Sequence, residues 1–227
     1  MRLDVSGPVR LPPTCPGLRI GLYGGSFNPA HLGHRHVSRV ALRRLGLDRI
    51  WWMVTPGNPL KDRAGLASIE ARVSAAQGIA AHPRIAVTAF ESRIGVRYTR
   101  QSLRYLAERH PAVRFVWIMG ADSLATFHRW QDYRAIAATM PIAIIDRPGF
   151  TLKGPAARGA RALGRWRIDE SDAGLLADLD PPAWVFLHGP RSHLSSTALR
   201  TGARKDGSSE DATGTFHVAS IQGTITA

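Results

Sequence analysis

One stretch near the N-terminus, residues 19–39 (RIGLYGGSFNPAHLGHRHVSR), constrains the fold of this chain more than any other. It begins with a short apolar run, Ile20–Tyr23, which is typical of a buried strand, and it breaks at Gly24–Gly25. A helical pattern then begins near Gly33. The first N–H groups of a helix have no intrahelical partner, and the helix dipole favours negative charge there. A strand, a glycine turn and a helix N-terminus together predict a phosphate-binding site.

Two histidines, His31 and His34, stand three residues apart at the entrance of this predicted helix. Imidazoles donate hydrogen bonds and can carry charge near neutral pH, so the pair would help to neutralise a triphosphate that approaches the glycines. The glycines of this stretch do not form a G-x-G-x-x-G fingerprint, and the chain has no Walker A sequence. This disfavours a hydride-transferring Rossmann dehydrogenase and a P-loop kinase.

The rest of the chain alternates apolar runs with helical patterns. The runs predict strands at residues 50–54, 85–90, 113–119, 142–145 and 184–187, and helical patterns occur at 69–81, 98–110 and 133–138 and from about 194 onward. This alternation predicts an α/β fold: a doubly wound, Rossmann-like parallel sheet with helices on both faces. Ligands of such sheets bind at the carboxyl ends of the strands, where the motifs of this chain also fall.

A second candidate phosphate site follows the last predicted strand. Ser195, Ser196 and Thr197 can cap a helix N-terminus, and Arg200 lies one turn further along the same face. Hydroxyl groups, free N–H groups and a guanidinium make a second cradle for phosphate. A triphosphate between the two cradles is the simplest arrangement that uses both.

Three parts of the chain differ in character. Residues 1–17 are rich in proline and predict a flexible extension, residues 18–200 carry the folded domain, and residues 201–227 predict a mostly disordered tail. Within the domain, the pattern weakens at residues 149–182, which fits a lid or a peripheral insertion. The single cysteine, Cys15, and the lack of a signal-like or membrane-spanning run favour a reducing, cytoplasmic setting.

The formal net charge of +13 suggests anionic partners, and all but three of the 30 basic residues are arginines. This bias fits either a genomic base composition or a functional basic surface. A nucleic-acid- or nucleotide-binding module is therefore the alternative outside the enzyme class. Because the arginines are scattered along the chain, small-molecule partners are favoured and nucleic acid is disfavoured.

Taken together, GGSFNPAHLGH and SSTALR make the chain resemble the nucleotidyltransferase superfamily of the HxGH type. The segments WWMVTPGNPLK, YTRQSL, FVWIMGADSLATFHRW and IIDRPGF are similar in order and spacing to the bacterial nicotinate-nucleotide adenylyltransferases. The similarity extends from about residue 18 to residue 200. Pantetheine-phosphate adenylyltransferases share the HxGH motif and the serine-rich helix start, but they are not expected to carry the GADSL and RPGF segments.

The resemblance implies transfer of AMP from ATP to nicotinate mononucleotide, which gives nicotinate adenine dinucleotide and pyrophosphate. It implies that His31, His34 and Arg200 are catalytic. The ATP-binding residues that it implies are Gly24, Gly25, Ser26, Phe27, Gly120, Asp122, Ser195, Ser196 and Thr197. The mononucleotide-binding residues that it implies are Lys61, Tyr98, Thr99, Trp130 and Arg147.

Catalysis of this kind needs positioning and neutralisation of phosphate charge more than a strong base, because the attacking phosphate is already ionised. Mg²⁺ is implied as the counter-ion of pyrophosphate and is expected to arrive with ATP, since no carboxylate cluster predicts a protein-held metal site. The acceptor itself stays open between the nicotinate and nicotinamide mononucleotides, which differ by one charge. The sequence leaves the oligomeric state undetermined.

Overall fold

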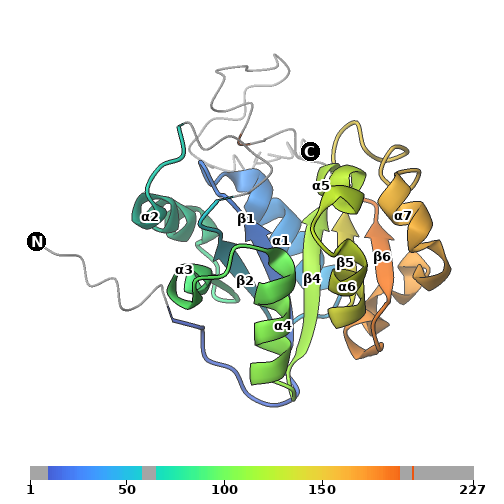
Figure 1. Cartoon of the computed structure of the whole chain (residues 1–227), viewed down its shortest axis with the longest axis horizontal. Coiled ribbons are helices and arrows are strands. Elements are labelled where there is room, and N and C mark those ends of the chain that lie inside the picture. Colours follow the sequence, from blue (N-terminus) through green and yellow to red (C-terminus); the bar gives the residue numbers. More distant parts are fainter. Residues whose placement is uncertain (1–9, 58–64, 190–195, 197–227) are drawn as a thin grey trace, which may run out of the picture.

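The structure is a computed structural model that describes residues 10–57, residues 65–189 and Ser196. Its centre is a six-stranded sheet in the order β3-β2-β1-β4-β5-β6, in which every neighbouring pair is parallel (Figure 1). The strands are β1 (Arg19–Gly25), β2 (Arg49–Val54), β3 (Ile85–Thr88), β4 (Arg114–Gly120), β5 (Ile142–Ile145) and β6 (Trp184–Leu187). The strand order reverses between β1 and β4, and in such sheets the crevice at this point, at the carboxyl ends, is the expected ligand site.

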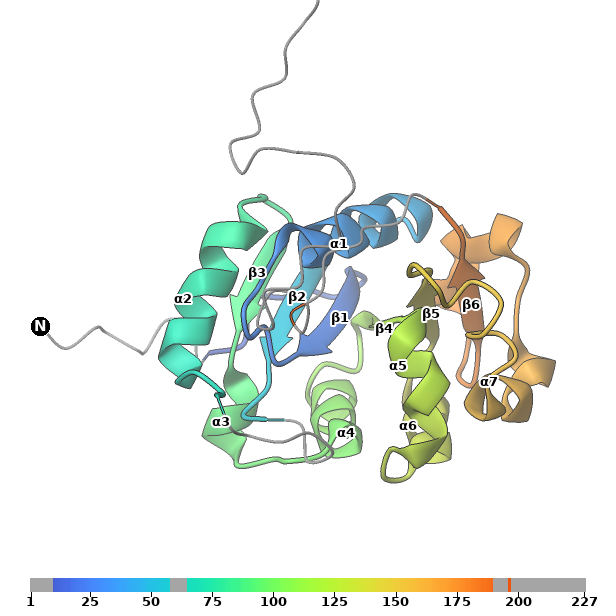
Figure 2. The ribbon, with the colours of Figure 1, turned by 90° about the horizontal axis from the view of Figure 1, so that it is seen from above.

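Both faces of the sheet are buried, because successive strand residues point to opposite sides and most of them are apolar. Leu22 and Trp51 belong to one core cluster, whereas their neighbours Tyr23 and Trp52 belong to the other. The cluster that contains Tyr23 and Trp52 is covered by α1 (Leu32–Arg44), α2 (Ile69–Ala80) and the 3-10 helix η3 (Glu170–Asp178). The cluster that contains Leu22 and Trp51 is covered by α3 (Phe90–Ile94), α4 (Thr99–Arg109), α5 (Ala121–Thr126), α6 (Tyr133–Thr139) and α7 (Arg158–Ala162). Figure 2 shows α1 and α2 on one side of the sheet and α4 and α6 on the other, which confirms the doubly wound fold.

The predicted strands are all present, with one shorter than expected. The sequence predicts a strand over residues 85–90, but β3 ends at Thr88 and α3 begins at Phe90. The Thr88 hydroxyl accepts the backbone N–H of Phe90 at 3.2 Å and donates to the carbonyl of Arg10 at 2.9 Å. These side-chain bonds replace strand pairing and turn the chain into a helix. The helices α3 and α5 are not predicted, because five or six residues are too few to show a helical period.

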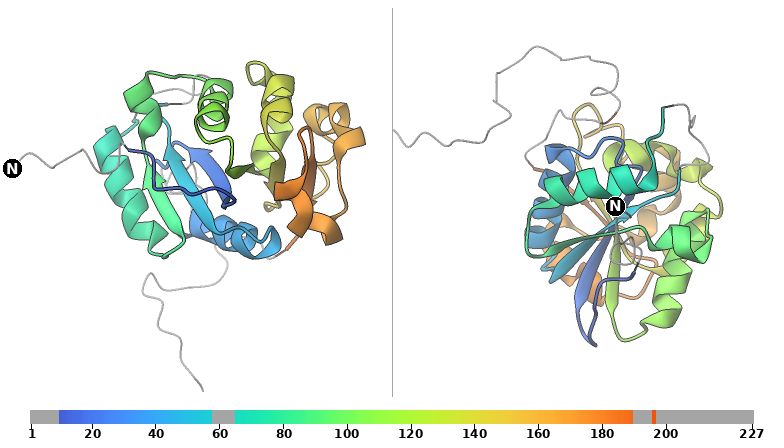
Figure 3. Two further views of the ribbon diagram at one scale, coloured as in Figure 1. Left: turned by 90° about the horizontal axis from the view of Figure 1, so that it is seen from below. Right: turned by 90° about the vertical axis from the view of Figure 1, so that its left-hand side faces the viewer.

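Residues 149–182 form the connection from β5 to β6. They contain α7, the 3-10 helix η2 (Gly164–Trp166) and η3, and they lie at the β6 edge of the sheet (Figure 3). Ala160 of α7 is buried in one core cluster, and Leu176 of η3 is buried in the other. This segment is therefore a crossover that completes both layers at the sheet edge.

Residues 10–17, which the sequence assigns to a flexible extension, lie against the domain. Leu11 packs on the core cluster that α4 covers, and Arg49 donates to the carbonyl of Pro13 at 3.4 Å. The N–H of Gly17 donates to the carbonyl of Ala112 at 2.7 Å. Because several prolines already restrict this backbone, ordering it costs less conformational entropy than an ordinary loop would. Residues 1–9 and the predicted tail, 201–227, lie outside the described residues.

Candidate active site

The glycine turn at the end of β1 is shaped by close packing. A Cβ atom at Gly24 would overlap the ring of Trp117 on β4, so the backbone there has no room for a side chain. A Cβ atom at Gly25 would lie 3.3 Å from the ring of Phe27. Phe27 has a φ of 46° and is almost fully buried, with its ring stacked 5.0 Å from that of Trp52. Only the backbone of Phe27 is therefore available to a ligand, and its predicted contact with ATP stays a prediction, as do those of Gly24, Gly25 and Ser26.

The two histidines lie against each other at the N-terminus of α1, where His31 is the capping residue. Their ring centroids are 3.9 Å apart, and both side chains are buried, at 5% and 9% exposure. The backbone N–H of His31 donates to Nδ1 of His34 at 3.2 Å. A neutral His34 with an acceptor at Nδ1 carries its proton on Nε2, so this ring presents an N–H donor from Nε2.

Neither histidine is charged at neutral pH. Burial and, after it, the nearby Arg147 guanidinium together lower the pKa of His31 to about 4. Burial, the adjacent His31 and Arg147 together lower the pKa of His34 to about 3. The pair therefore consists of hydrogen-bond donors and acceptors that carry no net charge.

Three buried side chains, those of Phe27, Ser38 and Trp52, fix the position of His34. The Phe27 ring lies 4.7 Å from the His34 ring. The Ser38 hydroxyl donates to the carbonyl of His34 at 3.0 Å and accepts the indole N–H of Trp52 at 2.7 Å. Because Trp52 and Ser38 are both fully buried, this arrangement leaves the histidine little freedom to move.

Asp122, in the first turn of α5, and Arg147, two residues after β5, add a charged pair to the same place. Arg147 lies 3.5 Å (Nε) from Oδ1 of Asp122, and both side chains contact the space beside the Cα of Gly120. Arg147 is largely buried, and its field reaches the two histidines and also Tyr23, whose pKa burial raises to about 12. The resemblance implies that Arg147 binds the mononucleotide; in the structure its guanidinium lies beside Asp122 and Gly120, two of the predicted ATP residues.

Several buried polar atoms at this place have no hydrogen-bond partner among the described residues. They are both ring nitrogens of His31 and Nη1 of Arg147. An unpaired buried polar group costs about 1–3 kcal/mol, so such groups are rare unless they serve a ligand. An anion with several acceptor oxygens, such as a phosphate, would satisfy the Arg147 N–H groups and the His31 ring nitrogen that carries the proton.

One bond joins this place to the second predicted phosphate cradle. The Ser196 hydroxyl donates to the carbonyl of Pro29 at 2.9 Å, two residues before His31. Ser196 therefore lies beside the start of α1, and the second phosphate cradle stays a prediction. Ser195, Thr197 and Arg200 lie outside the described residues, and so does Lys61.

The remaining predicted mononucleotide residues lie together on the α4–α6 side of the sheet. Tyr98 caps α4 and Thr99 is its first residue, and both are partly exposed. Trp130 precedes α6 and packs edge-on against Phe127 at 5.6 Å. The ion pair of Arg100 with Asp132, at 2.7 Å, holds the first turn of α4 next to the Trp130 loop.

Sequence reasoning missed a buried arginine that shapes the glycine turn. Arg72 of α2 is 3% exposed and donates to the carbonyls of Ser26 at 2.8 Å, Thr55 at 2.7 Å and Ala67 at 2.9 Å. It thereby ties the turn after β1 to the end of β2. The signal in the sequence is weak, because an arginine beside the apolar stripe of a helix ordinarily extends into solvent.

Asn28 fixes the other side of the same turn. Its side chain donates to the carbonyl of Gly65 at 3.0 Å and accepts the N–H of Ala67 at 3.4 Å. The end of the polar loop after β2 is therefore anchored to the glycine turn. This is the loop that carries Lys61, the predicted ligand of the mononucleotide phosphate.

Comparisons with known proteins agree with this geometry. Residues 22–202 match the family model described as cytidylyltransferase-like. A probable nicotinate-nucleotide adenylyltransferase of Methylorubrum extorquens is 65% identical over 184 residues, which is 81% of this chain and 100% of the relative. The protein of the same name from Agrobacterium fabrum is 59% identical over 181 residues, 80% of this chain and 97% of that protein.

A solved structure shares the fold. Nicotinic acid mononucleotide adenylyltransferase of Plasmodium falciparum, complexed with NaAD, superposes with a TM-score of 0.61 at 21% identity, covering 81% of this chain and 83% of that chain. The parallel sheet and the histidine site at its reversal point define a nucleotidyltransferase. The chain belongs to the cytidylyltransferase-like family. Within that family, its curated relatives carry the name nicotinate-nucleotide adenylyltransferase.

Proposed function

We infer that this chain transfers AMP from ATP to nicotinate mononucleotide, which gives nicotinate adenine dinucleotide and releases pyrophosphate. The observation that carries this inference is the 65% identity over the full length of a relative named for this activity. The geometry of the site is the independent support.

The reaction forms one bond and breaks one bond at the α-phosphorus of ATP. An oxygen of the mononucleotide phosphate attacks this phosphorus, and the bridging oxygen to the β-phosphate leaves as part of pyrophosphate. The attacking oxygen is already ionised at neutral pH, so no proton has to be removed. What the protein must supply is alignment of the two substrates and compensation for the charge that accumulates on the phosphoryl oxygens.

We propose that the histidines and Arg147 divide this task. His34 donates from Nε2 to a non-bridging oxygen of the transferred phosphate, and His31 offers its unpaired ring to the same group. Because both rings are neutral, the fixed positive charge comes from Arg147, whose Nη1 is buried and unpaired within the described part of the chain. Asp122 holds the guanidinium in place and leaves a carboxylate oxygen for the ribose.

The acceptor would lie on the α4 side. We propose that Trp130 stacks on the pyridine ring, that Tyr98 and Thr99 read its carboxylate, and that Lys61 binds the mononucleotide phosphate. Support for this arrangement is that the first three lie on neighbouring elements joined by the Arg100–Asp132 ion pair. For ATP, we propose that Ser195, Ser196, Thr197 and Arg200 bind the triphosphate opposite the glycine turn, since Ser196 already contacts Pro29.

We propose that Mg²⁺ enters with the phosphates of ATP. Across residues 10–57 and 65–189, no three histidine, cysteine or acidic side chains gather in a way that would hold a metal ion. The donor set of the described site therefore does not fit a resident metal, and no step here depends on one. No helix in the described ranges is long and apolar enough to cross a membrane. We further propose a reducing, cytoplasmic setting, because the chain's one cysteine, Cys15, is exposed and has no disulfide partner.

The test is release of pyrophosphate from ATP with nicotinate mononucleotide and, in parallel, with nicotinamide mononucleotide. We expect the acid to be preferred in kcat/KM. A preference for the amide would overturn the assignment of the acceptor, and no release with either would overturn the reaction itself.

A further inference from the structure

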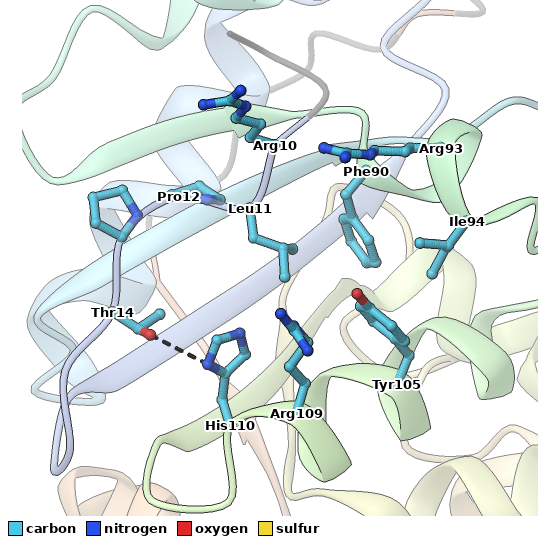
Figure 4. A pocket seen from close by; sticks show the side chains of 11 residues that line it. Arg10, Leu11, Pro12, Thr14, Phe90, Arg93, Ile94, Tyr105, Arg109 and His110 are labelled. Atoms are coloured by element: carbon cyan, nitrogen blue, oxygen red, sulfur yellow. Dashed lines mark hydrogen bonds between the residues drawn. The ribbon is translucent and has the colours of Figure 1, made fainter. Parts of the chain in front are cut away.

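A cavity lies apart from the histidine site, between the N-terminal segment 10–14, α3 and the second half of α4 (Figure 4). Its volume is about 450 Å³. None of the residues proposed above to bind ATP or the mononucleotide lines it. The lining comprises Arg10, Leu11, Pro12, Pro13, Thr14, Phe90, Arg93, Ile94, Tyr105, Arg109 and His110. Cavities of this size are in the range that encloses small ligands.

The walls of the cavity are apolar and include flat rings. Leu11 projects from the N-terminal segment toward Phe90 and Tyr105, and Ile94 closes the end of the space (Figure 4). The rings of Phe90 and Tyr105 are nearly parallel, with an interplanar angle of 20° and centroids 6.0 Å apart. Phe90 is almost fully buried behind Tyr105, whose partly exposed ring offers an apolar surface on which a flat group can pack.

The edge of the same cavity is positively charged. Arg10, Arg93 and Arg109 line it, and the lining contains no acidic side chain. In the part of the chain that the structure describes, none of these three arginines forms an ion pair, whereas Arg104 on the same helix pairs with Glu108 at 2.7 Å. The excess positive charge is therefore not compensated locally and favours an anion.

Hydrogen bonds hold the walls in place without a ligand. The N-terminal segment is fixed at Arg10, whose carbonyl accepts from Thr88, and at Thr14, whose hydroxyl lies 3.3 Å from Nδ1 of His110. On the other side, the Ser102 hydroxyl donates to Glu91 at 2.5 Å and joins α4 to α3. A preformed cavity loses little entropy when it binds, which favours affinity for a small molecule.

We propose that this cavity binds a small ring compound that carries a phosphate or carboxylate group, of mononucleotide size or smaller. The ring packs on the partly exposed Tyr105 and Leu11, and the anionic group accepts hydrogen bonds from Arg109, whose guanidinium points into the cavity (Figure 4). Guanidinium groups bind both kinds of anion through paired N–H bonds. The site is separate from the transfer reaction and does not depend on it.

The first experiment is calorimetry on the full chain with phenyl phosphate and benzoate, and with inorganic phosphate and benzyl alcohol as partial ligands. We expect at least one of the two complete probes to bind about tenfold more tightly than either partial ligand, because it uses both the rings and the arginines. Equal affinity for inorganic phosphate would show a plain anion site, and equal affinity for benzyl alcohol a plain apolar one. Either result, or no binding of phenyl phosphate or benzoate, would overturn the proposal.

The second experiment locates the bound probe. Arg109→Gln should weaken binding about tenfold or more, whereas the matched control Arg104→Gln on the same helix should leave it unchanged. Both arginines are exposed, so neither change should prevent folding. In methyl NMR, the Ile94 signal should shift on titration and that of Ile145, next to the histidine site, should not. Unaltered binding by Arg109→Gln, or a shift at Ile145 without one at Ile94, would contradict this location.

Discussion

His34 differs from an ordinary surface histidine in two respects that act together: it is buried without charge, and its proton is placed by a backbone N–H. The bond from the N–H of His31 to Nδ1 leaves Nε2 as the donor. Because the ring is packed against Phe27, the direction of this donor is set before substrate arrives. Preorganised donors of this kind are worth more than flexible ones, since no reorganisation is needed during the reaction.

We expect His34→Ala to lower kcat by about 100- to 1000-fold, as loss of one preorganised donor does in other phosphoryl- or acyl-transfer sites. His34→Gln should recover part of this loss, because its amide can donate from a similar position. Pyrophosphate release under saturating substrates measures both variants. The control is His36→Ala, two residues further along α1, for which we expect nearly normal kcat. Full activity of His34→Ala would contradict the proposed role.

Arg147 acts on the same histidines through its charge. It lowers the pKa of both rings, so its removal should raise both values toward the ordinary range. We expect Arg147→Ala to show this rise in an NMR titration and to lose about 100-fold in kcat, whereas Arg147→Lys should keep the low pKa values. In the unaltered protein, neither ring should titrate between pH 6 and pH 8. Histidine signals that titrate near pH 6.5 would show that the pair is not buried as described.

At the scale of the elements, the site depends on how α2 is attached to the ends of β1 and β2. Arg72 is the link, since its guanidinium donates to three backbone carbonyls from positions far apart in the sequence. A buried charge that makes so many bonds cannot be replaced by an apolar side chain without leaving carbonyls unpaired. The glycine turn that precedes the histidines is therefore held in place by Arg72 of α2, a helix that packs on the sheet.

We expect Arg72→Met to lower the free energy of unfolding by about 3 kcal/mol and to raise the KM for ATP more than it lowers kcat. The reason is that the Ser26 and Thr55 carbonyls lose their donor while the histidines keep theirs. Urea denaturation and steady-state kinetics measure the two effects. Gln77→Ala, an exposed change on the same helix, is the control and should change neither. An unchanged KM for ATP would show that the turn does not need this support.

At the scale of the whole molecule, the sequence predicted what depends on local pattern. The strands follow from apolar runs, and the glycine turn with His31 and His34 follows from spacing. The place of Arg147 was beyond such reasoning, because it follows β5 and meets the end of β4 only through the sheet order. Arg72 was missed for a similar reason: its partners lie on other elements. Long-range contacts of single polar side chains leave no periodic trace in a sequence.

Two buried sets of titratable groups make the stability of the whole fold depend on pH in opposite directions. Between about pH 4 and pH 6.5, His31 and His34 bind protons only when the chain unfolds, so they make stability rise with pH. Glu91, at 6% exposure, does the reverse. Burial raises its pKa to about 7, against a bond from Ser102 that opposes the shift. Its contribution is complete below pH 4.5 and is lost as the pH rises through 7.

We therefore expect Glu91→Gln to stabilise the protein at pH 8, by up to about 3 kcal/mol, and to make much less difference at pH 5. Glutamine keeps the acceptor for Ser102 but cannot carry the buried charge that the carboxyl must take above pH 7. Urea denaturation at intervals between pH 5 and pH 8 measures the difference. Glu108→Gln, an exposed change on α4, is the control and should follow the unaltered protein. Parallel curves for Glu91→Gln and the unaltered protein would show that Glu91 does not titrate in this range, and the histidines alone would then set the pH dependence.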